Sequence, residues 1–250
     1  MTQVLRVTQV LSFSGGRNGR FSDHSCHQKL HDDLTGVVWH NGEMSAHDLV
    51  IRNASLVDGT GAPARMADVA VSDGVITEIG PRLSGIGTRE IEADGLTVTP
   101  GFVDIHTHFD GQATWDPILA PSSIHGVTSI VMGNCGVGFA PARPTPEQHA
   151  WLIGMLEGVE DIPGTALAEG LAWDWETFPD YMNALDRREY AIDVATQVAH
   201  APLRAYVMGE RGADPLEAPT VDELARMALM VREGMQAGAL GFTTSRTYVH

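Results

Sequence analysis

Lysine is almost absent from this chain of 250 residues, in which Lys29 is the only one. Lysine and arginine together number 16 against 32 acidic side chains, so the formal net charge at pH 7 is −16. Such a surface repels the phosphates of nucleic acid and of anionic lipid. Binding to nucleic acid or to a membrane is therefore not expected, and a small molecule is the expected partner.

Long apolar runs and cysteines are scarce as well. The sequence has no uninterrupted apolar stretch of about 18 residues, the length that indicates a membrane-spanning helix. Residues 1–20 lack the apolar core and small-residue cleavage site of a secretory signal. Cys26 and Cys135, the two cysteines, lie far apart in unlike contexts and suggest no disulfide framework. These absences predict a cytoplasmic protein.

Residues 1–45 differ in composition from the rest of the chain. They are polar and rich in glycine, without helical or strand periodicity. His24, His27 and His31 lie near Cys26 and form a group able to bind metal, but the composition favours a disordered leader.

Residues 46–99 have the pattern of a small all-β module. Short apolar runs alternate with turn residues, as in "DLVIRNASLVDG" and "ADVAVSDGVITEIG". Asp73-Gly74 and Asp94-Gly95 each separate two such runs. Asp-Gly is a strong signal for a two-residue hairpin turn, because both central positions of that turn need a positive φ. The module is therefore predicted to consist of hairpins.

From Pro100 onward, strands alternate with helices. Apolar runs predict about four strands, near 102–106, 127–132, 193–199 and 239–243. Helical patterns are found at 146–157, 175–188 and 220–238. In the last of these, Thr220 and Glu223 predict a capping box, and Gly238 is typical of the end of a helix. The alternation predicts a parallel sheet in an α/β unit.

Two histidines follow the first of these strands, in "PGFVDIHTHFDGQ" at 100–112. Residues i and i+2 of a strand point to the same side, so His106 and His108 should face one way and Thr107 the other. Two imidazoles about 6–7 Å apart along a strand can grip one metal ion. Two histidines that merely bond to backbone explain the short pattern equally well.

Cys135 ends the second strand segment, "GVTSIVMGNCGVGFAP" at 126–141. If the two strands are parallel neighbours, the thiol arrives at the same rim as the histidines, and a thiolate is a strong zinc ligand. The alternative is a buried structural thiol. Gly136 and Gly138 argue against an ordinary core position, because glycine lets the backbone approach a site closely.

These segments, together with "MLEGVEDIPGTAL" and "WDWETFPDYMNALDRR", resemble the sequence motifs of a known superfamily. Over residues 47–250 the chain resembles the amidohydrolase superfamily and, within it, the N-acyl-D-amino-acid deacylases (D-aminoacylases). The resemblance implies a (β/α)8 TIM barrel with a small β-sandwich domain, and hydrolysis of N-acyl-D-amino acids by metal-activated water. Because eight strands close such a barrel, residues 100–250 are expected to be its N-terminal half and 46–99 part of the sandwich.

The resemblance also assigns roles to residues. His106 and His108 match paired ligands of one or two zinc ions, and Cys135 matches a cysteine that can bridge two metal positions. Other amidohydrolases use a carboxylated lysine as the bridge, which Lys29 cannot provide from the leader. The general-base aspartate is expected beyond residue 250. The chain alone is therefore expected to look truncated, to have negligible activity and, with open sheet edges, to associate with itself.

Other side chains are weaker candidates. His200 can line the pocket or play a structural role, and Arg204 or Arg246 can hold a substrate carboxylate. His125 and His149 are expected to be solvated.

Two further readings stay open. One is another amidohydrolase, such as a cyclic amidase, a dipeptidase or a deaminase. The other is a non-catalytic scaffold that keeps the fold and purifies without stoichiometric zinc.

Overall fold

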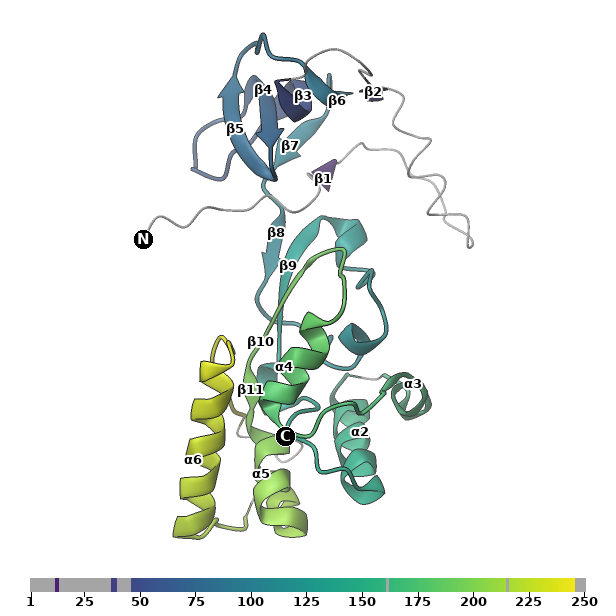
Figure 1. Ribbon diagram of the computed structural model, residues 1–250, viewed down its shortest axis with the longest axis vertical. Coiled ribbons are helices and arrows are strands. Elements are labelled where there is room, and N and C mark those ends of the chain that lie inside the picture. Colours follow the sequence, from purple (N-terminus) through teal and green to yellow (C-terminus); the bar gives the residue numbers. More distant parts are fainter. Residues whose placement is uncertain (1–11, 14–36, 40–45, 161, 215, 246–250) are drawn as a thin grey trace. The chain divides into compact units, whose positions relative to one another are not determined.

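The computed structural model describes residues 12–13, 37–39, 46–160, 162–214 and 216–245. They fall into two compact units, Met1–Gly101 and Phe102–His250 (Figure 1). The predicted disordered leader, 1–45, lies mostly outside the described residues. The five residues described within it are in strands, β1 (Ser12–Phe13) and β2 (Val37–Trp39).

The first unit is a single mixed sheet. Its other strands are β3 (His47–Leu56), β4 (Arg65–Ser72), β5 (Val75–Gly80), β6 (Gly87–Glu92) and β7 (Thr97–Thr99). The order is β1-β7-β3-β4-β5, and β6 pairs with β2 and β3. Alternate residues of β3 and β4, including Ile51 and Val69, pack into an apolar core.

One of the two predicted hairpins is present. Asp73 and Gly74 have φ of 51° and 71° and join the antiparallel strands β4 and β5, which confirms the first prediction. The second prediction is wrong, because β6 and β7 do not pair with each other. Both run parallel to β3, and β6 lies beside its first half and β7 beside its end. Asp94-Gly95 therefore lies between two strands that pair with the same edge of β3. This break between β6 and β7 follows the bulge of β3 at Asn53, whose φ is 55°.

The second unit is an α/β arrangement of parallel strands. β8 (Phe102–Asp104), β9 (Val127–Met132) and β10 (Asp193–Thr196) form a sheet in the order β10-β9-β8. β11 (Val198–Ala199) pairs in parallel with β12 (Phe242–Thr243). The strand predicted at 193–199 is thus divided at Gln197, whose N–H donates to the carbonyl of Met132. The α/β class is confirmed, and closure into a barrel stays a prediction.

Five α-helices are described in this unit. They are α2 (Pro146–Glu160), α3 (Gly164–Gly170), α4 (Phe178–Asp186), α5 (His200–Met208) and α6 (Val221–Gln236). The capping box of Thr220 and Glu223 is present on α6, and Gly238 follows the helix with φ of 111°. α5 and α6 pack side by side (Figure 1). No helix in the described ranges is both long and apolar enough to cross a membrane.

Helix α4 begins three residues later than the pattern suggested. Thr177 caps its N-terminus and exchanges hydrogen bonds with Asp180, so Pro179 falls in the first turn, where its missing N–H costs nothing. Tyr181, fully buried on this helix, donates to the carbonyl oxygen of Asp110 at 2.7 Å. The loop that follows the histidine pair is thereby fixed to α4.

The edges of the parallel strands expose apolar side chains. Phe102 and Val103 on β8 are 58% and 62% exposed, and Phe242 on β12 is 44% exposed. Within the described residues β8 pairs only with β9, and β12 only with β11. Unpaired strands with apolar side chains favour association with further strands.

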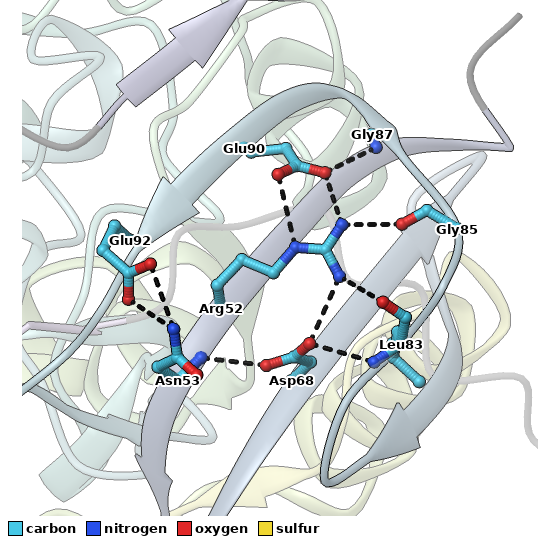
Figure 2. A network of polar contacts seen from close by, with 8 residues as sticks. All are labelled: Arg52, Asn53, Asp68, Leu83, Gly85, Gly87, Glu90 and Glu92. Atoms are coloured by element: carbon cyan, nitrogen blue, oxygen red, sulfur yellow. Dashed lines mark hydrogen bonds and ion pairs between the residues drawn. The ribbon is translucent and has the colours of Figure 1, made fainter.

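A half-buried polar network ties a loop of the first unit to its sheet (Figure 2). Arg52 on β3 is only 18% exposed and donates to Asp68 on β4 and to Glu90 on β6. The same guanidinium donates to the carbonyl oxygens of Leu83 at 2.8 Å and Gly85 at 2.7 Å. One side chain therefore satisfies two carboxylates and two backbone carbonyls.

Asp68 is ionised within this network although burial opposes its charge. Its side chain is 4% exposed, which would raise its pKa, but N–H groups of Asn53 and Leu83 donate to it, and Arg52 lies beside it. The donors outweigh the burial, and the pKa of Asp68 is lowered from its usual value.

We expect Arg52→Met to destabilise the first unit by about 3 kcal/mol, because the buried carboxylate and two carbonyls lose their donor. A carboxyl with a lowered pKa contributes stability above about pH 3.9, and that contribution is lost as pH falls through the lowered pKa. The difference between variant and wild type should therefore shrink in acid. Hydrogen exchange of β3 and β4 amides measures it.

Arg65→Met is the matched control, because Arg65 pairs with Asp58 at the surface and is 46% exposed. Surface ion pairs contribute little to stability. Equal protection of β3 and β4 in the two variants would contradict the role given to Arg52.

Candidate metal centre

The histidine pair lies just beyond β8 and not in the strand itself. The strand ends at Asp104, whose carboxylate accepts from the N–H of His106 at 3.1 Å and turns the chain out of regular pairing. Thr107 stays anchored to the neighbouring strand, because its N–H and its hydroxyl both donate to the carbonyl oxygen of Val131. Thr107 is buried. The rings of His106 and His108, on either side of it in the sequence, lie 5.4 Å apart, centre to centre.

Cys135 lies in a turn with unusual backbone geometry after β9. Gly133, Cys135 and Gly136 all have positive φ, of 77°, 54° and 76°. A positive φ is uncommon for a residue with a side chain and persists where the surroundings hold it. The turn directs the Cys135 Sγ back towards β8, to 3.2 Å from the Nε2 of His106.

The three candidate ligands converge. One ligand atom each from His106, His108 and Cys135 lies within 4.8 Å of the others. Tetrahedral zinc, with bonds of about 2.0–2.3 Å, holds its ligand atoms roughly 3.3–3.8 Å apart. Two imidazoles and a thiol are zinc's preferred donor types, and small side-chain shifts reach that geometry. The donor set therefore fits zinc, and in the described part of the chain no aspartate or glutamate joins the group.

Thr243 and His200 surround the turn that carries Cys135. The Thr243 hydroxyl accepts from the N–H of Gly136 and donates to the carbonyl of Gly133. His200 is the first residue of α5, and a Cβ on Gly136 would lie 3.4 Å from its Cβ. Burial and the nearby Arg204 lower the pKa of His200, so its imidazole is neutral at pH 7.

The structure places the weaker candidates differently from the sequence predictions. Arg204 is held by the backbone, because its Nε and Nη2 donate to the carbonyls of Gly212, Asp214 and Glu217; its binding of a substrate carboxylate stays a prediction. His149 is half-buried and stacks on Trp173 at 3.8 Å, so the prediction of a solvated role is wrong.

His125 is exposed, as expected. Arg246 lies outside the described residues.

A surface hollow of about 380 Å³ was not foreseen from the sequence. It is lined by Pro144, Trp173, Asp174, Trp175, Glu176, Asp180, Asn183 and Arg187. None of the three candidate ligands lines it.

Comparison with known proteins gives consistent results. The amidohydrolase family model matches residues 89–250. An N-acyl-D-aspartate deacylase of Alcaligenes xylosoxydans xylosoxydans is 36% identical over 202 residues, which are 80% of this chain and 37% of that protein. A D-aminoacylase of the same organism is 34% identical over 202 residues, 80% of this chain and 38% of that protein.

Solved structures agree. The N-acyl-D-glutamate deacylase of Bordetella bronchiseptica, in complex with zinc and a phosphonate inhibitor, matches with a TM-score of 0.64 and 36% identity, over 79% of this chain and 38% of that one. A D-aminoacylase structure described with a binuclear metal centre matches with a TM-score of 0.65 and 32% identity, over 79% and 38%. The chain thus spans a little over a third of the length of the relatives it matches.

The turn geometry predicts a strong effect of Gly133→Ala. The alanine would keep a positive φ, a strain worth about 1–3 kcal/mol, and its Cβ would overlap the backbone of Gln197. We expect a loss of at least about 2 kcal/mol in the free energy of unfolding, measured by urea denaturation.

Gly154→Ala is the control, because nothing lies within 4 Å of a Cβ added at this position of helix α2. It should stabilise the helix by about 0.5–1 kcal/mol. If Gly133→Ala were as stable as this control, the turn would not be constrained as described.

Proposed function

Because the chain belongs to the amidohydrolase family, we propose that it carries part of the metal centre of a hydrolase that cleaves the amide bond of N-acyl-D-amino acids. His106, His108 and Cys135 would hold one or two zinc ions. The observation that carries the proposal is that these three side chains follow the ends of two parallel strands and bring one ligand atom each to within 4.8 Å of the others. The similarity to deacylases of D-amino acids supports the substrate class.

The chemistry follows from the donor set. When bound, zinc would lower the pKa of water to about 7 and polarise a carbonyl oxygen. His106 and His108 would hold it as neutral imidazoles, and Cys135 would hold it as a thiolate. With Cys135 as the one anionic ligand among the three, the site would keep a net positive charge that attracts a substrate carboxylate.

The proton-transfer group is proposed to come from sequence beyond residue 250. Amide hydrolysis needs a base that accepts the water proton and returns it to the leaving amine. Within the described ranges no carboxylate joins the three ligands. The parallel strands β8 to β12 are likewise proposed to be the first half of a (β/α)8 barrel that further strands would close. A cytoplasmic location stays a prediction.

Metal binding and turnover test the proposal together. We expect the chain to bind zinc, and Cys135→Ser to weaken binding at least tenfold, because a hydroxyl is a far poorer zinc ligand than a thiolate. Isothermal titration calorimetry measures the affinity. The chain alone should release no D-amino acid from an N-acetyl-D-amino acid.

The competing functions give other results. Unchanged zinc affinity in Cys135→Ser would contradict the proposed centre, and robust turnover by the 250-residue chain would contradict the missing base. Hydrolysis of cyclic amides in preference to N-acyl-D-amino acids, by a chain extended to the length of its relatives, would favour a cyclic amidase. A chain so extended that binds no zinc would favour the scaffold.

We also propose that the exposed strand edges make this chain self-associate. Val103→Lys on β8 places a charge on such an edge and should lower the average mass in sedimentation velocity. Val221→Lys is the control, because Val221 is 82% exposed at the start of α6. A wild-type chain that is monomeric at every concentration tested would contradict the proposal.

A further inference from the structure

The carboxamide of Asn134 lies where the segments that carry the three candidate ligands meet. Asn134 directly precedes Cys135, and the residue is 7% exposed. Its Nδ2 donates to the carbonyl oxygen of Thr107 at 3.2 Å and to that of Val131 at 2.9 Å. Thr107 lies between the two candidate histidines. The side chain of Asn134, the residue before Cys135, is therefore hydrogen-bonded to Thr107, the residue between His106 and His108.

The other end of this carboxamide is held from a third strand segment. Gln197, between β10 and β11, donates from Nε2 to the Oδ1 of Asn134 at 3.0 Å. Gly241 lies beside this amide, and a Cβ added at Gly241 would come within 3.0 Å of the Gln197 Oε1. Since both partners of the Asn134 nitrogen are carbonyl oxygens, the orientation of the amide is fixed.

We propose that Asn134 and Gln197 are positioning residues that set the separation between the imidazole pair and the thiol, and thereby the metal affinity of the centre. This inference rests on the metal role proposed above for His106, His108 and Cys135.

The physical reason is the backbone of the turn. Cys135 holds a φ of 54°, a conformation that costs free energy and relaxes unless its neighbours fix it. Asn134 fixes it from the preceding residue, and without the amide the carbonyl of Thr107 would lose a buried donor. Thr243 fixes the turn from the other side, through Gly136. Without the Asn134 side chain, the Cys135 thiol would move away from the two imidazoles, whereas the fold would persist.

Cobalt binding tests the proposal. Co²⁺ added to the metal-free chain reports thiolate coordination through a sulfur-to-cobalt charge-transfer band, separately from its total affinity. Asn134→Leu, close in size but without hydrogen bonds, should bind Co²⁺ about 10–100-fold more weakly. The charge-transfer band per bound ion should fall more than the ligand-field bands do, because the sulfur is displaced and the histidines are not.

Gln197→Met is the second variant and decides the matter if Asn134→Leu does not fold. It removes the donor to Asn134 and should lower the same band. Gln148→Met is the matched control, because Gln148 is a buried amide on α2 that accepts from the nearby N–H of Arg143. It should cost stability but leave cobalt affinity and spectrum unchanged.

The outcomes are distinct. A folded Asn134→Leu with wild-type affinity and band would overturn the positioning role while leaving the proposed function intact. If Asn134→Leu does not fold, a folded Gln197→Met with wild-type affinity and band would overturn the positioning role in the same way. A spectral change in Gln148→Met equal to that in the two variants would reduce their effect to general destabilisation and would also overturn it. A wild-type chain with no charge-transfer band would refute the proposed centre, and this inference with it.

Discussion

The candidate metal centre depends on one contact, the 3.2 Å approach of the His106 Nε2 to the Cys135 Sγ. It requires the chain to reverse direction directly after β9, through left-handed backbone at Gly133, Cys135 and Gly136. Such backbone costs free energy, which the surrounding hydrogen bonds offset. The thiol is therefore held towards the histidines by the polar groups beneath it as much as by the strand that leads to it.

The same physical principle operates in the first unit, with a different result. There Arg52 gathers two carboxylates and two carbonyls, and every partner comes from the same small sheet and the loop that follows β5. This network fixes a loop and offers no exposed donor set. The candidate metal centre differs because its donor atoms are left accessible: His106 is exposed, and His108 and Cys135 are half-buried.

Much of the candidate site was predictable, because its ligands lie beside strands with strong patterns. The spacing of His106 and His108 and the glycines around Cys135 were visible in the sequence. The hydrogen bonds of Asn134 and Gln197 were not, since they depend on which strands are neighbours. The hairpin predicted at Asp94-Gly95 was wrong because a dipeptide cannot reveal that β6 and β7 share an edge of β3. The prediction of a solvated His149 was wrong because an imidazole in the sequence does not indicate its aromatic partner. The backbone partners of Arg204 could not be predicted for the same reason.

Zinc K-edge X-ray absorption of the zinc-loaded chain tests the central claim most directly. We predict one sulfur neighbour at about 2.3 Å and nitrogen neighbours at about 2.0–2.1 Å, consistent with Cys135 and two imidazoles on the same ion. A first shell made of nitrogen and oxygen alone would show that the thiol and the histidines do not share a metal, and would contradict this prediction.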